Sequence, residues 1–339
     1  MSQRIPEDAD AKARRAAERE RLSAHRDKAT WGDHLVPLGE FRRAAETFGV
    51  SRDDETRGAA RAAFAAPKAP TEEKVEGPFH RVAVFGGIYN NSFGLEALLE
   101  DARRRGAEAI FCLGDFGGFG PLPEKVWPLL QEGGVLSIQG NYEESLSSGA
   151  EDCNCGYADP RDNHFAEVSY RYTERNCSQE YKAYMGSLPR RRRIRVGDRE
   201  LLLVHGSPRR VNEFLFASTA PKPFLEVLCD QERADGILCT HTGLQWHRHL
   251  PSGRDVVNVG VIGRPANDGE TNVWYSMLEA RTDGSLGVEL IPLTYDHEAL
   301  ASEMRREELP DEFVETILTG WWTTCLEILP AKERAASRF

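Results

Sequence analysis

Short apolar runs alternate with segments of helical spacing from residue 80 onward. Buried strands are predicted where the apolar runs are continuous, at residues 81–85, 109–113, 135–138, 201–204, 236–239 and 256–259. Helices are predicted where apolar residues recur every three or four positions, at residues 95–105, 123–131, 179–188 and 224–234. Two later runs, 273–279 and 286–293, predict antiparallel, edge-like strands. The alternation of strands and helices predicts a layered α/β domain.

The first 79 residues follow a different pattern. Residues 1–30 are rich in Ala, Arg and Glu, with Leu22 almost the only large apolar side chain, so an exposed helix with little to bury is predicted. An amphipathic helix is predicted between residues 31 and 50, where the apolar positions with helical spacing are Phe41, Ala44, Ala45 and Phe48. Prolines and a glycine mark residues 65–78 as a linker.

These patterns divide the chain into three parts. Residues 1–79 are predicted to be a helical, partly flexible extension and linker, residues 80–319 the main domain, and residues 320–339 a carboxyl-terminal tail. Trp321 and Trp322 of the tail are expected to pack against the domain or against a partner subunit, which leaves a homo-oligomer as an open alternative.

The composition narrows the class of protein. The chain has 339 residues, 40% of them apolar, which is enough to bury a substantial core. Its net charge of -11 disfavours binding to nucleic acid and to anionic lipid, because both are polyanions. No apolar run approaches the roughly 20 residues of a membrane-spanning helix, and the amino terminus is charged where a secretory signal would be apolar. We therefore expect a cytoplasmic protein that binds neither a membrane nor nucleic acid.

The cysteines and a run of arginines have plain structural interpretations. Seven cysteines form an odd, scattered set, so reduced, packed thiols are expected rather than a disulfide framework. Cys153 and Cys155 are expected to be incidental thiols of a loop, because a structural zinc site normally needs four ligands. The arginines at 190–193, with Arg195, are expected to coat a solvated edge.

Polar side chains follow four of the predicted strands. Asp115 comes after the strand at 109–113, and Asn141, His205 and His241 follow three further strands. Because the loops that follow the strands of an open α/β sheet converge at one edge, these side chains are expected to lie close together. A carboxylate, an amide oxygen and two imidazoles suit manganese, iron or zinc. The sequence therefore predicts a metal site formed by Asp115, Asn141, His205 and His241.

Four segments of the main domain are similar, in order, to motifs of a known family. They are residues 114–121 (GDFGGFGP), 184–189 (YMGSLP), 203–208 (LVHGSP) and 258–265 (NVGVIGRP). Through them, residues 80 to about 318 resemble the calcineurin-like metallophosphoesterases, particularly the small bacterial and archaeal branch. The resemblance implies a four-layer α/β/β/α sandwich of two mixed sheets, with a two-metal site at one end that activates water against a phosphoester.

The chain departs from the family's pattern at one of the two metals. The resemblance implies an aspartate and a histidine where this chain has Gly87 and Tyr89, and a second histidine where it has Gly243. The ligands of the other metal match Asp115, Asn141, His205 and His241, all present. One or two divalent or trivalent ions are therefore expected, with one site intact and its neighbour remodelled.

Several residues are candidates to replace the lost ligands. Tyr89 could bind iron as a phenolate, or its ring could fill the space of a missing ion. Glu143 lies beside a motif loop and is a second candidate. His247 and His249 occupy alternate strand positions, so they are expected to face one side, either toward the site or on an exposed hairpin.

The first functional hypothesis is an atypical metal-dependent hydrolase of a phosphoester or a related ester. Its catalytic candidates are Asp115 and Tyr142, since the family's Asn-His pair reads Asn141-Tyr142 and the phenol could donate a proton to the leaving group. Arg209 and Arg264 are candidates to hold a small phosphorylated or anionic substrate, with solvated surface arginines as the alternative. Two other hypotheses stay open: a binding or scaffold protein on a catalytically retired phosphoesterase fold, and a remodelled metal centre with non-phosphatase, redox chemistry.

Overall fold

The computed structural model describes residues 28–31, 34–37 and 74–337. The chain divides into two compact units, Met1–Pro70 and Thr71–Phe339. In the first unit, β1 (Lys28–Trp31) pairs antiparallel with β2 (His34–Pro37). Strands therefore stand at 28–31 and 34–37, where the sequence predicts helices, and the remainder of both predicted helices lies outside the described residues.

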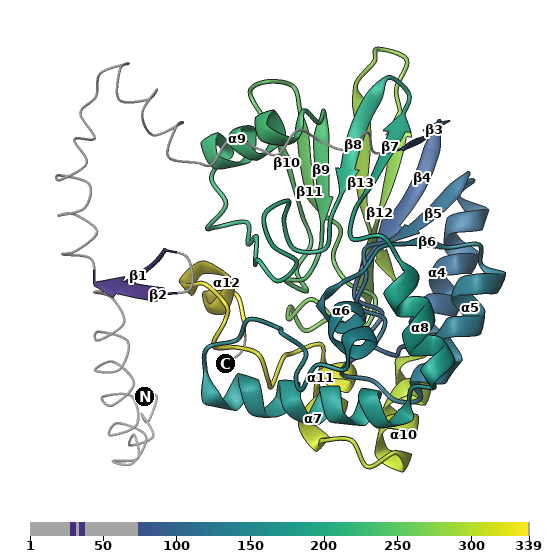
Figure 1. Cartoon of the computed structure of the whole chain (residues 1–339), viewed down its shortest axis with the longest axis vertical. Coiled ribbons are helices and arrows are strands. Elements are labelled where there is room, and N and C mark those ends of the chain that lie inside the picture. Colours follow the sequence, from purple (N-terminus) through teal and green to yellow (C-terminus); the bar gives the residue numbers. More distant parts are fainter. Residues whose placement is uncertain (1–27, 32–33, 38–73, 338–339) are drawn as a thin grey trace, which may run out of the picture. The chain divides into compact units, whose positions relative to one another are not determined.

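Two mixed sheets form the body of the larger unit (Figure 1). The six-stranded sheet has the order β10-β11-β9-β8-β7-β3, and the five-stranded sheet has the order β13-β12-β4-β5-β6. The first comprises β3 (Val75–Phe79), β7 (Arg192–Val196), β8 (Arg199–Leu203), β9 (Gly236–Cys239), β10 (Trp246–His249) and β11 (Asp255–Asn258). The second comprises β4 (Arg81–Phe85), β5 (Ala109–Cys112), β6 (Leu136–Ser137), β12 (Val273–Ala280) and β13 (Leu286–Leu293). Parallel neighbours β4, β5 and β6 contrast with the antiparallel pairs β4/β12 and β12/β13.

Helices cover the outer faces of the sheets and the end where the site lies. They are α4 (Ser92–Arg104), α5 (Val126–Glu132) after the turn η1 (Pro123–Lys125), α6 (Asn141–Ser148), α7 (Pro160–Asn176), α8 (Gln179–Ser187), α9 (Lys222–Glu232), α10 (His297–Arg306), α11 (Asp311–Thr319) and α12 (Ala331–Ala335). Among the described residues, no helix combines the length and apolar character that crossing a bilayer requires.

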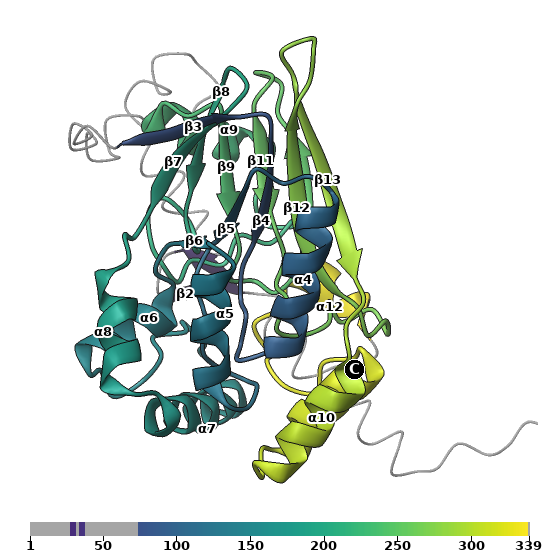
Figure 2. The same cartoon turned by 90° about the vertical axis from the view of Figure 1, so that its right-hand side faces the viewer.

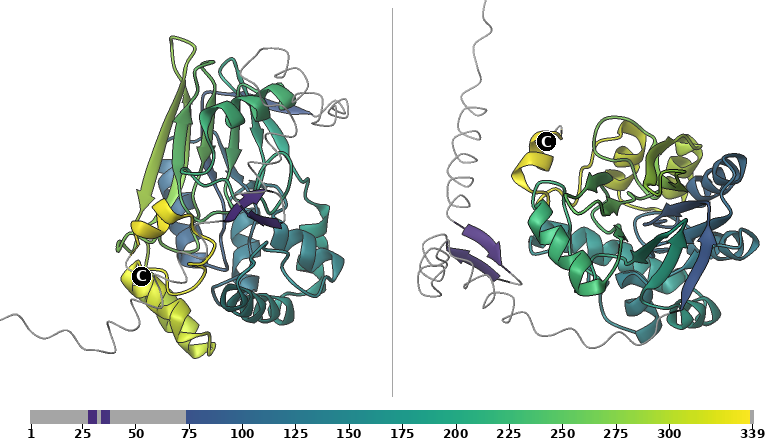
Figure 3. Two further views of the ribbon diagram at one scale, coloured as in Figure 1. Left: turned by 90° about the vertical axis from the view of Figure 1, so that its left-hand side faces the viewer. Right: turned by 90° about the horizontal axis from the view of Figure 1, so that it is seen from above.

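The two-residue period of strand side chains builds the layers. In β4, Val82 and Val84 belong to the core between the two sheets, whereas Ala83 and Phe85 belong to a core on the outer face of the five-stranded sheet. Helices α4 and α5 cover this outer face (Figure 2), and α9 covers the outer face of the six-stranded sheet (Figure 3). The predicted α/β/β/α sandwich of two mixed sheets is therefore confirmed.

Most predicted elements of the main domain are present. The six buried strands and the four helices lie within a few residues of their expected bounds. One expectation for β12 is wrong, because β12 lies between β13 and β4 and is not an edge strand. The sequence patterns did not predict α6, α7, α10, α11 or β7. Strand β3 lies inside the expected linker and pairs in parallel with β7, so the folded unit begins before residue 80.

The arginine run is only partly solvated: Arg190 and Arg195 are exposed as expected, but Arg192 and Arg193 begin β7 and are paired within the fold. Arg193 is buried, and its guanidinium donates a 2.7 Å hydrogen bond to the carbonyl of Glu232 and pairs with Glu200. Arg192 pairs with Glu76 of β3. The charges that make this segment look exposed are neutralised by carboxylates from distant parts of the chain, which allows the strand to lie between β8 and β3.

The tail beyond α11 packs on its own domain. The Trp322 side chain is fully buried, its Nε1–H donates to the carbonyl of Pro265 at 2.7 Å, and its backbone N–H donates to Asn267 Oδ1 at 2.8 Å. Of the two alternatives drawn from the sequence, the indole ring packs against the domain itself. The tail thereby reaches the end of the sandwich where the loops after β4, β5, β8 and β9 meet α6 and α7 (Figure 1).

Candidate metal centre

The structure brings together all four predicted metal ligands. His205 Nε2 lies 3.1 Å from Asn141 Oδ1, 3.1 Å from His241 Nδ1 and 3.3 Å from Asp115 Oδ2. Each side chain comes from a segment that follows a different strand, namely β5, β6, β8 or β9, and all are buried. In the part of the chain that the structure describes, Asp115, His205 and His241 form the group whose ligand atoms lie within 4.8 Å of one another.

Hydrogen bonds outside the centre orient these ligands. His205 Nδ1 lies 2.6 Å from the carbonyl of Leu113, so Nδ1 carries a proton and Nε2 is the ring atom that faces the centre, where it can ligate once it is deprotonated. Asn141 Nδ2 donates to the carbonyl of Cys153 at 2.8 Å, which turns Oδ1 inward. An imidazole lone pair, an amide oxygen and a carboxylate oxygen that face one another are unfavourable unless a proton or a cation lies between them. The donor set therefore fits a divalent ion of borderline hardness.

The pKa values of the ligands follow the same electrostatics. Burial alone would raise the pKa of Asp115, but the adjacent His205 holds it below its usual value. Burial opposes protonation of His205, whereas Asp115 raises the pKa of that ring above its usual value. Burial, with His205 adding to the effect, lowers the pKa of His241 to about 3, so this ring is neutral at pH 7 and its lone pair can ligate.

Backbone geometry also points to a constrained site. Asp115 has a φ of 59° and His241 a φ of 68°, so both ligands adopt the left-handed conformation that non-glycine residues seldom occupy. Gly140 permits the close approach of the loops, because a Cβ atom at this position would lie 2.4 Å from Asp115 Oδ1. Such backbone strain clusters at functional sites in proteins.

Glu143 is not placed as a replacement ligand. Its carboxylate accepts backbone N–H groups from Asp115 at 2.7 Å, from Phe116 at 2.8 Å and from Gly140 at 2.7 Å, which engages both oxygens. Burial, together with Asp115, raises the pKa of Glu143 to about 7. Its position as the third residue of α6, where an acidic side chain caps a helix, is the sequence signal for this structural role.

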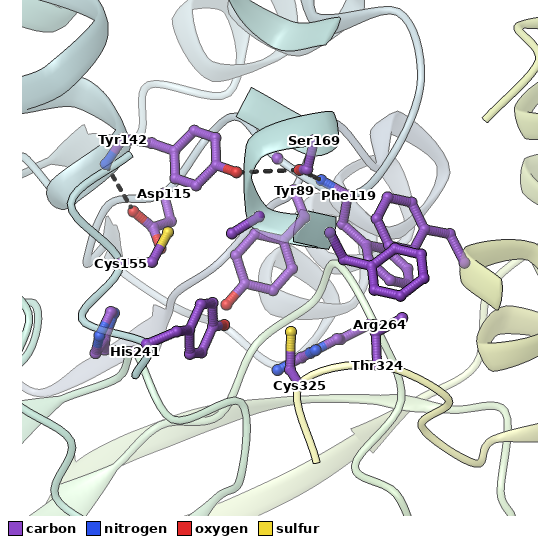
Figure 4. A pocket seen from close by; sticks show the side chains of 15 residues that line it. Tyr89, Asp115, Phe119, Tyr142, Cys155, Ser169, His241, Arg264, Thr324 and Cys325 are labelled. Carbon is purple, nitrogen blue, oxygen red and sulfur yellow. Dashed lines mark hydrogen bonds between the residues drawn. The ribbon is translucent and has the colours of Figure 1, made fainter. Parts of the chain in front are cut away.

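A pocket opens beside the centre (Figure 4). Asp115 and His241 contribute to its wall together with the ring of Tyr142, and aromatic side chains from Phe119, Phe165 and Phe313 form much of the remainder. The Tyr142 hydroxyl lies 3.0 Å from Ser169 Oγ, and burial raises the pKa of this phenol, so it stays protonated. Ser169 and Phe165 belong to α7, a helix that the sequence patterns missed, so this wall could not be anticipated.

The remodelled side of the site is filled by protein atoms. A Cβ atom on Gly87 would lie 2.8 Å from Tyr89 Cζ and 2.5 Å from Val261 Cγ1. A Cβ atom on Gly243 would lie 3.0 Å from the Trp322 ring and 3.1 Å from Arg264 Nη2. Burial raises the pKa of Tyr89, with Arg264 opposing the shift, so the phenol is neutral without a cation. This packing favours the ring-filling interpretation of Tyr89 over the phenolate ligand.

Three other candidates lie outside the pocket. Arg209 pairs with Glu213 and lies 5.0 Å from the Phe224 ring centroid. It does not line the pocket, although the sequence suggested it as a residue that holds the substrate. His247 Nε2 and His249 Nδ1 bind the same oxygen, Asp255 Oδ1, at 2.8 and 3.0 Å. The two histidines do face one side of β10, where they contact the Asp255 carboxylate and not the candidate metal centre.

The expectation for Cys153 and Cys155 is wrong, because the two residues form a disulfide. Their loop lies against the centre: Cys153 accepts the Asn141 amide, and Cys155 lines the pocket. The other cysteines of the described residues are free and buried, as expected. Cys325 is one of these, and its thiol lies in the pocket beside Arg264 (Figure 4).

A sandwich of two mixed sheets, with candidate metal ligands at the strand ends, is an architecture of the metal-dependent phosphoesterases. The chain belongs to the calcineurin-like phosphoesterase superfamily, whose domain profile matches residues 80–283. Members of this family use divalent metal ions, and the Asp115, His205 and His241 group is the candidate centre here.

Two solved structures share this fold, and a third protein is similar in sequence. A hypothetical protein from Pyrococcus horikoshii OT3 is 22% identical with a TM-score of 0.61, covering 72% of this chain and 99% of that one. A metallophosphoesterase from Sphaerobacter thermophilus is 24% identical with a TM-score of 0.55, covering 71% of this chain and 99% of that one. An uncharacterized protein from Methanocaldococcus jannaschii is 22% identical over 257 residues, which is 70% of this chain and 98% of the relative.

Proposed function

We propose that the protein is a metal-dependent hydrolase of a phosphoester, with Asp115, Asn141, His205 and His241 as the ligands of one catalytic cation. The observation that carries this proposal is the convergence of four donor atoms, from four strand-end segments, around His205 Nε2. A binding protein with no metal would have no need to bury a carboxylate, an amide oxygen and two imidazoles in mutual contact, since unpaired buried polar groups are costly.

The residues around the cation would have different roles in hydrolysis. A divalent ion supplies Lewis acidity, which polarises a phosphoryl oxygen and lowers the pKa of water. Asp115 and His241 present their ligand atoms at the pocket wall, while Leu113 and Cys153 hold the His205 and Asn141 side chains in the ligating orientation.

Tyr142 is proposed to act on the leaving group. Its backbone N–H donates to Asp115 Oδ1 at 3.2 Å, and its phenol lies in the pocket against Ser169. Because burial raises the pKa of Tyr142, the phenol is a hydrogen-bond donor at every working pH and a weak proton donor. Slow turnover, or a preference for good leaving groups, is therefore expected.

The test compares metal content and turnover in the same preparations. The full-length chain loaded with manganese, iron or zinc is expected to hold the ion through dialysis and to cleave p-nitrophenyl phosphate. His205→Ala and Asp115→Asn are each expected to lower metal affinity and to reduce turnover by about 100-fold or more. His247→Ala is the matched control, because His247 also binds a carboxylate but lies outside the pocket.

The alternatives give different results in this experiment. A chain that retains no metal and cleaves no ester in a broad panel would support a binding or scaffold protein. Metal without hydrolysis, together with a visible tyrosine-to-iron charge-transfer band, would support a redox centre with Tyr89 as ligand. Loss of that band in Tyr89→Phe would identify the ligand.

A further inference from the structure

A buried arginine faces the metal centre across the pocket. Arg264 is 6% exposed, and its Cζ lies 3.6 Å from the Trp322 ring centroid and 5.9 Å from that of Tyr89. Arg264 lines the same pocket as Asp115 and His241. In Figure 4, Arg264 and Cys325 lie on the other side of the Tyr89 ring from Tyr142 and Asp115.

The guanidinium lacks the partner that a buried cation requires. Within the described residues, Arg264 forms no ion pair with an aspartate or glutamate, and its Nε atom has no hydrogen-bond partner. The guanidinium forms a hydrogen bond with the Cys325 thiol, and the phenols of Tyr157 and Tyr89 also lie near enough to act on its charge. A buried charge is costly unless an opposite charge and hydrogen bonds compensate it. Arg248 offers a contrast, because it also stacks on an indole but donates to the carbonyls of Ala217 and Ala220.

The position of Arg264 is tied to the remodelled side of the site. Its Nη2 atom lies 3.1 Å from the point where Gly243 would carry a Cβ atom, so a side chain at residue 243 would press on the guanidinium. The chain thus has a fixed positive charge in the space that the substitution to glycine leaves. Stacking on Trp322 holds the guanidinium plane in place, and a fixed planar fork suits the paired oxygens of a phosphoryl group.

We propose that Arg264 is an anion subsite that binds the phosphoryl group of a phosphomonoester between its guanidinium and the cation held by Asp115 and His241, so that the centre works with one metal ion. This inference rests on the proposed function and names its substrate class. Among the side chains that line the pocket, Asp115 supplies a carboxylate and Arg264 a guanidinium. One divalent cation with these two residues leaves about two positive charges, which match a dianionic monoester better than a monoanionic diester.

The experiment measures inorganic phosphate binding by calorimetry to the manganese-loaded full-length chain. Arg264→Lys keeps a positive charge, and Arg264→Met keeps a similar stem without the charge. Arg264→Met is expected to bind phosphate about 10- to 100-fold more weakly than Arg264→Lys, as loss of a charge-assisted hydrogen bond predicts. Because both variants lose the guanidinium packing, the difference between their phosphate affinities measures the contribution of the positive charge. Arg248→Met is expected to bind phosphate like the wild type.

Equal phosphate affinity in Arg264→Lys and Arg264→Met would overturn the proposal, as would two tightly held manganese ions per wild-type chain. Steady-state kinetics add a second arm, in which Arg264→Met is expected to raise KM for p-nitrophenyl phosphate more than for bis(p-nitrophenyl) phosphate. The same increase for both would overturn the monoester assignment. Phosphate binding that depends on Arg264 in a chain without any esterase activity would uphold the subsite and contradict the hydrolase.

Discussion

The Glu143 carboxylate accepts the backbone N–H of Asp115 at 2.7 Å, and the same oxygen accepts the N–H of Gly140 at 2.7 Å. Glu143 therefore joins the loop that follows β5 to the first turn of α6. Asp115 and Asn141 are carried by these two segments, so one buried carboxylate fixes the spacing of two candidate ligands. The acidic side chain is directed to these backbone N–H groups and supports the candidate metal centre without serving as one of its ligands.

Glu143→Gln should weaken the metal centre without removing a ligand. The amide that replaces one oxygen would turn a donor toward a backbone N–H, and the resulting unsatisfied groups cost about 1–3 kcal/mol in free energy of unfolding. Loss of such support typically lowers metal affinity about 10- to 100-fold. Manganese titration and urea unfolding measure the two effects.

Glu144→Gln is the matched control for this change. Glu144 is the next residue of α6 and pairs with the exposed Arg190 at 2.9 Å. An exposed pair contributes about 0–1 kcal/mol, so metal affinity should not change. Wild-type manganese affinity in Glu143→Gln would contradict the supporting role.

Gly87→Ala should be more destabilising than its backbone conformation alone explains. Gly87 has a φ of +48°, and a Cβ atom there would approach Val261 Cγ1 to 2.5 Å. Left-handed strain costs about 1–2 kcal/mol, and overpacking adds about 1–3 kcal/mol. Gly134 has a φ of +63° with open space around it, so Gly134→Ala carries the strain without the collision. Chemical unfolding gives the free energy of unfolding of both variants, and the difference between their losses is the cost of the steric collision at Gly87.

The same collision predicts that restoring an acidic residue does not restore a second metal. Gly87→Asp is expected to destabilise the fold and to leave the manganese content of the chain unchanged. Tyr89→Ala removes the ring that lies 2.8 Å from the added Cβ atom, so the double variant should be destabilised by less than the sum of the two single variants. Two ions per chain in Gly87→Asp alone would contradict the ring-filling role of Tyr89.

The sandwich was largely predictable because its strands are short and apolar on both faces. Val82 and Val84 face one core and Ala83 and Phe85 face another, so β4 reads as a continuous apolar run. The convergence of the four candidate ligands was predictable for a related reason, since each follows such a run at the edge where loops converge. The family resemblance added which of these polar residues belong together.

Two of the missed elements, α7 and β7, have polar residues where the simple patterns require apolar ones. The buried face of α7 includes Asp162, Ser169 and Thr173, so its periodicity is not hydrophobic. Its hydroxyl groups instead bind the pocket loop, as when Ser169 accepts the Phe119 N–H at 2.5 Å. The arginines of β7 and the stacking of Arg264 on Trp322 depend on partners remote in sequence. No local pattern indicates such pairs.

Trp322→Ala should disrupt both the tail and the anion subsite. The buried indole packs under Arg264 and donates to Pro265, and truncation of a buried aromatic costs about 3–5 kcal/mol. Without the ring the guanidinium loses its fixed plane, so phosphate affinity should fall together with stability. Thermal unfolding and phosphate calorimetry report the two effects.

Trp321→Ala is the control that distinguishes an effect on the anion subsite from a general loss of tail packing. Trp321 is only partly buried and packs against Gly269, away from Arg264. A moderate loss of stability with wild-type phosphate affinity is expected. Equal loss of phosphate affinity in the two tryptophan variants would show that the tail acts as a whole and not through the Trp322 ring.

Asp255 gives a pH-dependent contribution to stability that is independent of the metal centre. Burial would raise the pKa of this carboxyl, but hydrogen bonds from His247 and His249 lower it below its usual value. A lowered folded-state pKa stabilises the fold above the unfolded-state pKa of about 3.9, and this stabilisation is lost as the pH falls through the folded-state value. Asp255→Asn should therefore be destabilised at pH 7 by about 1–3 kcal/mol. Its deficit relative to the wild type should shrink below about pH 4. Urea unfolding from pH 7 to pH 3 measures this change, and a deficit that stays constant with pH would mean that Asp255 contributes by packing and not by its charge.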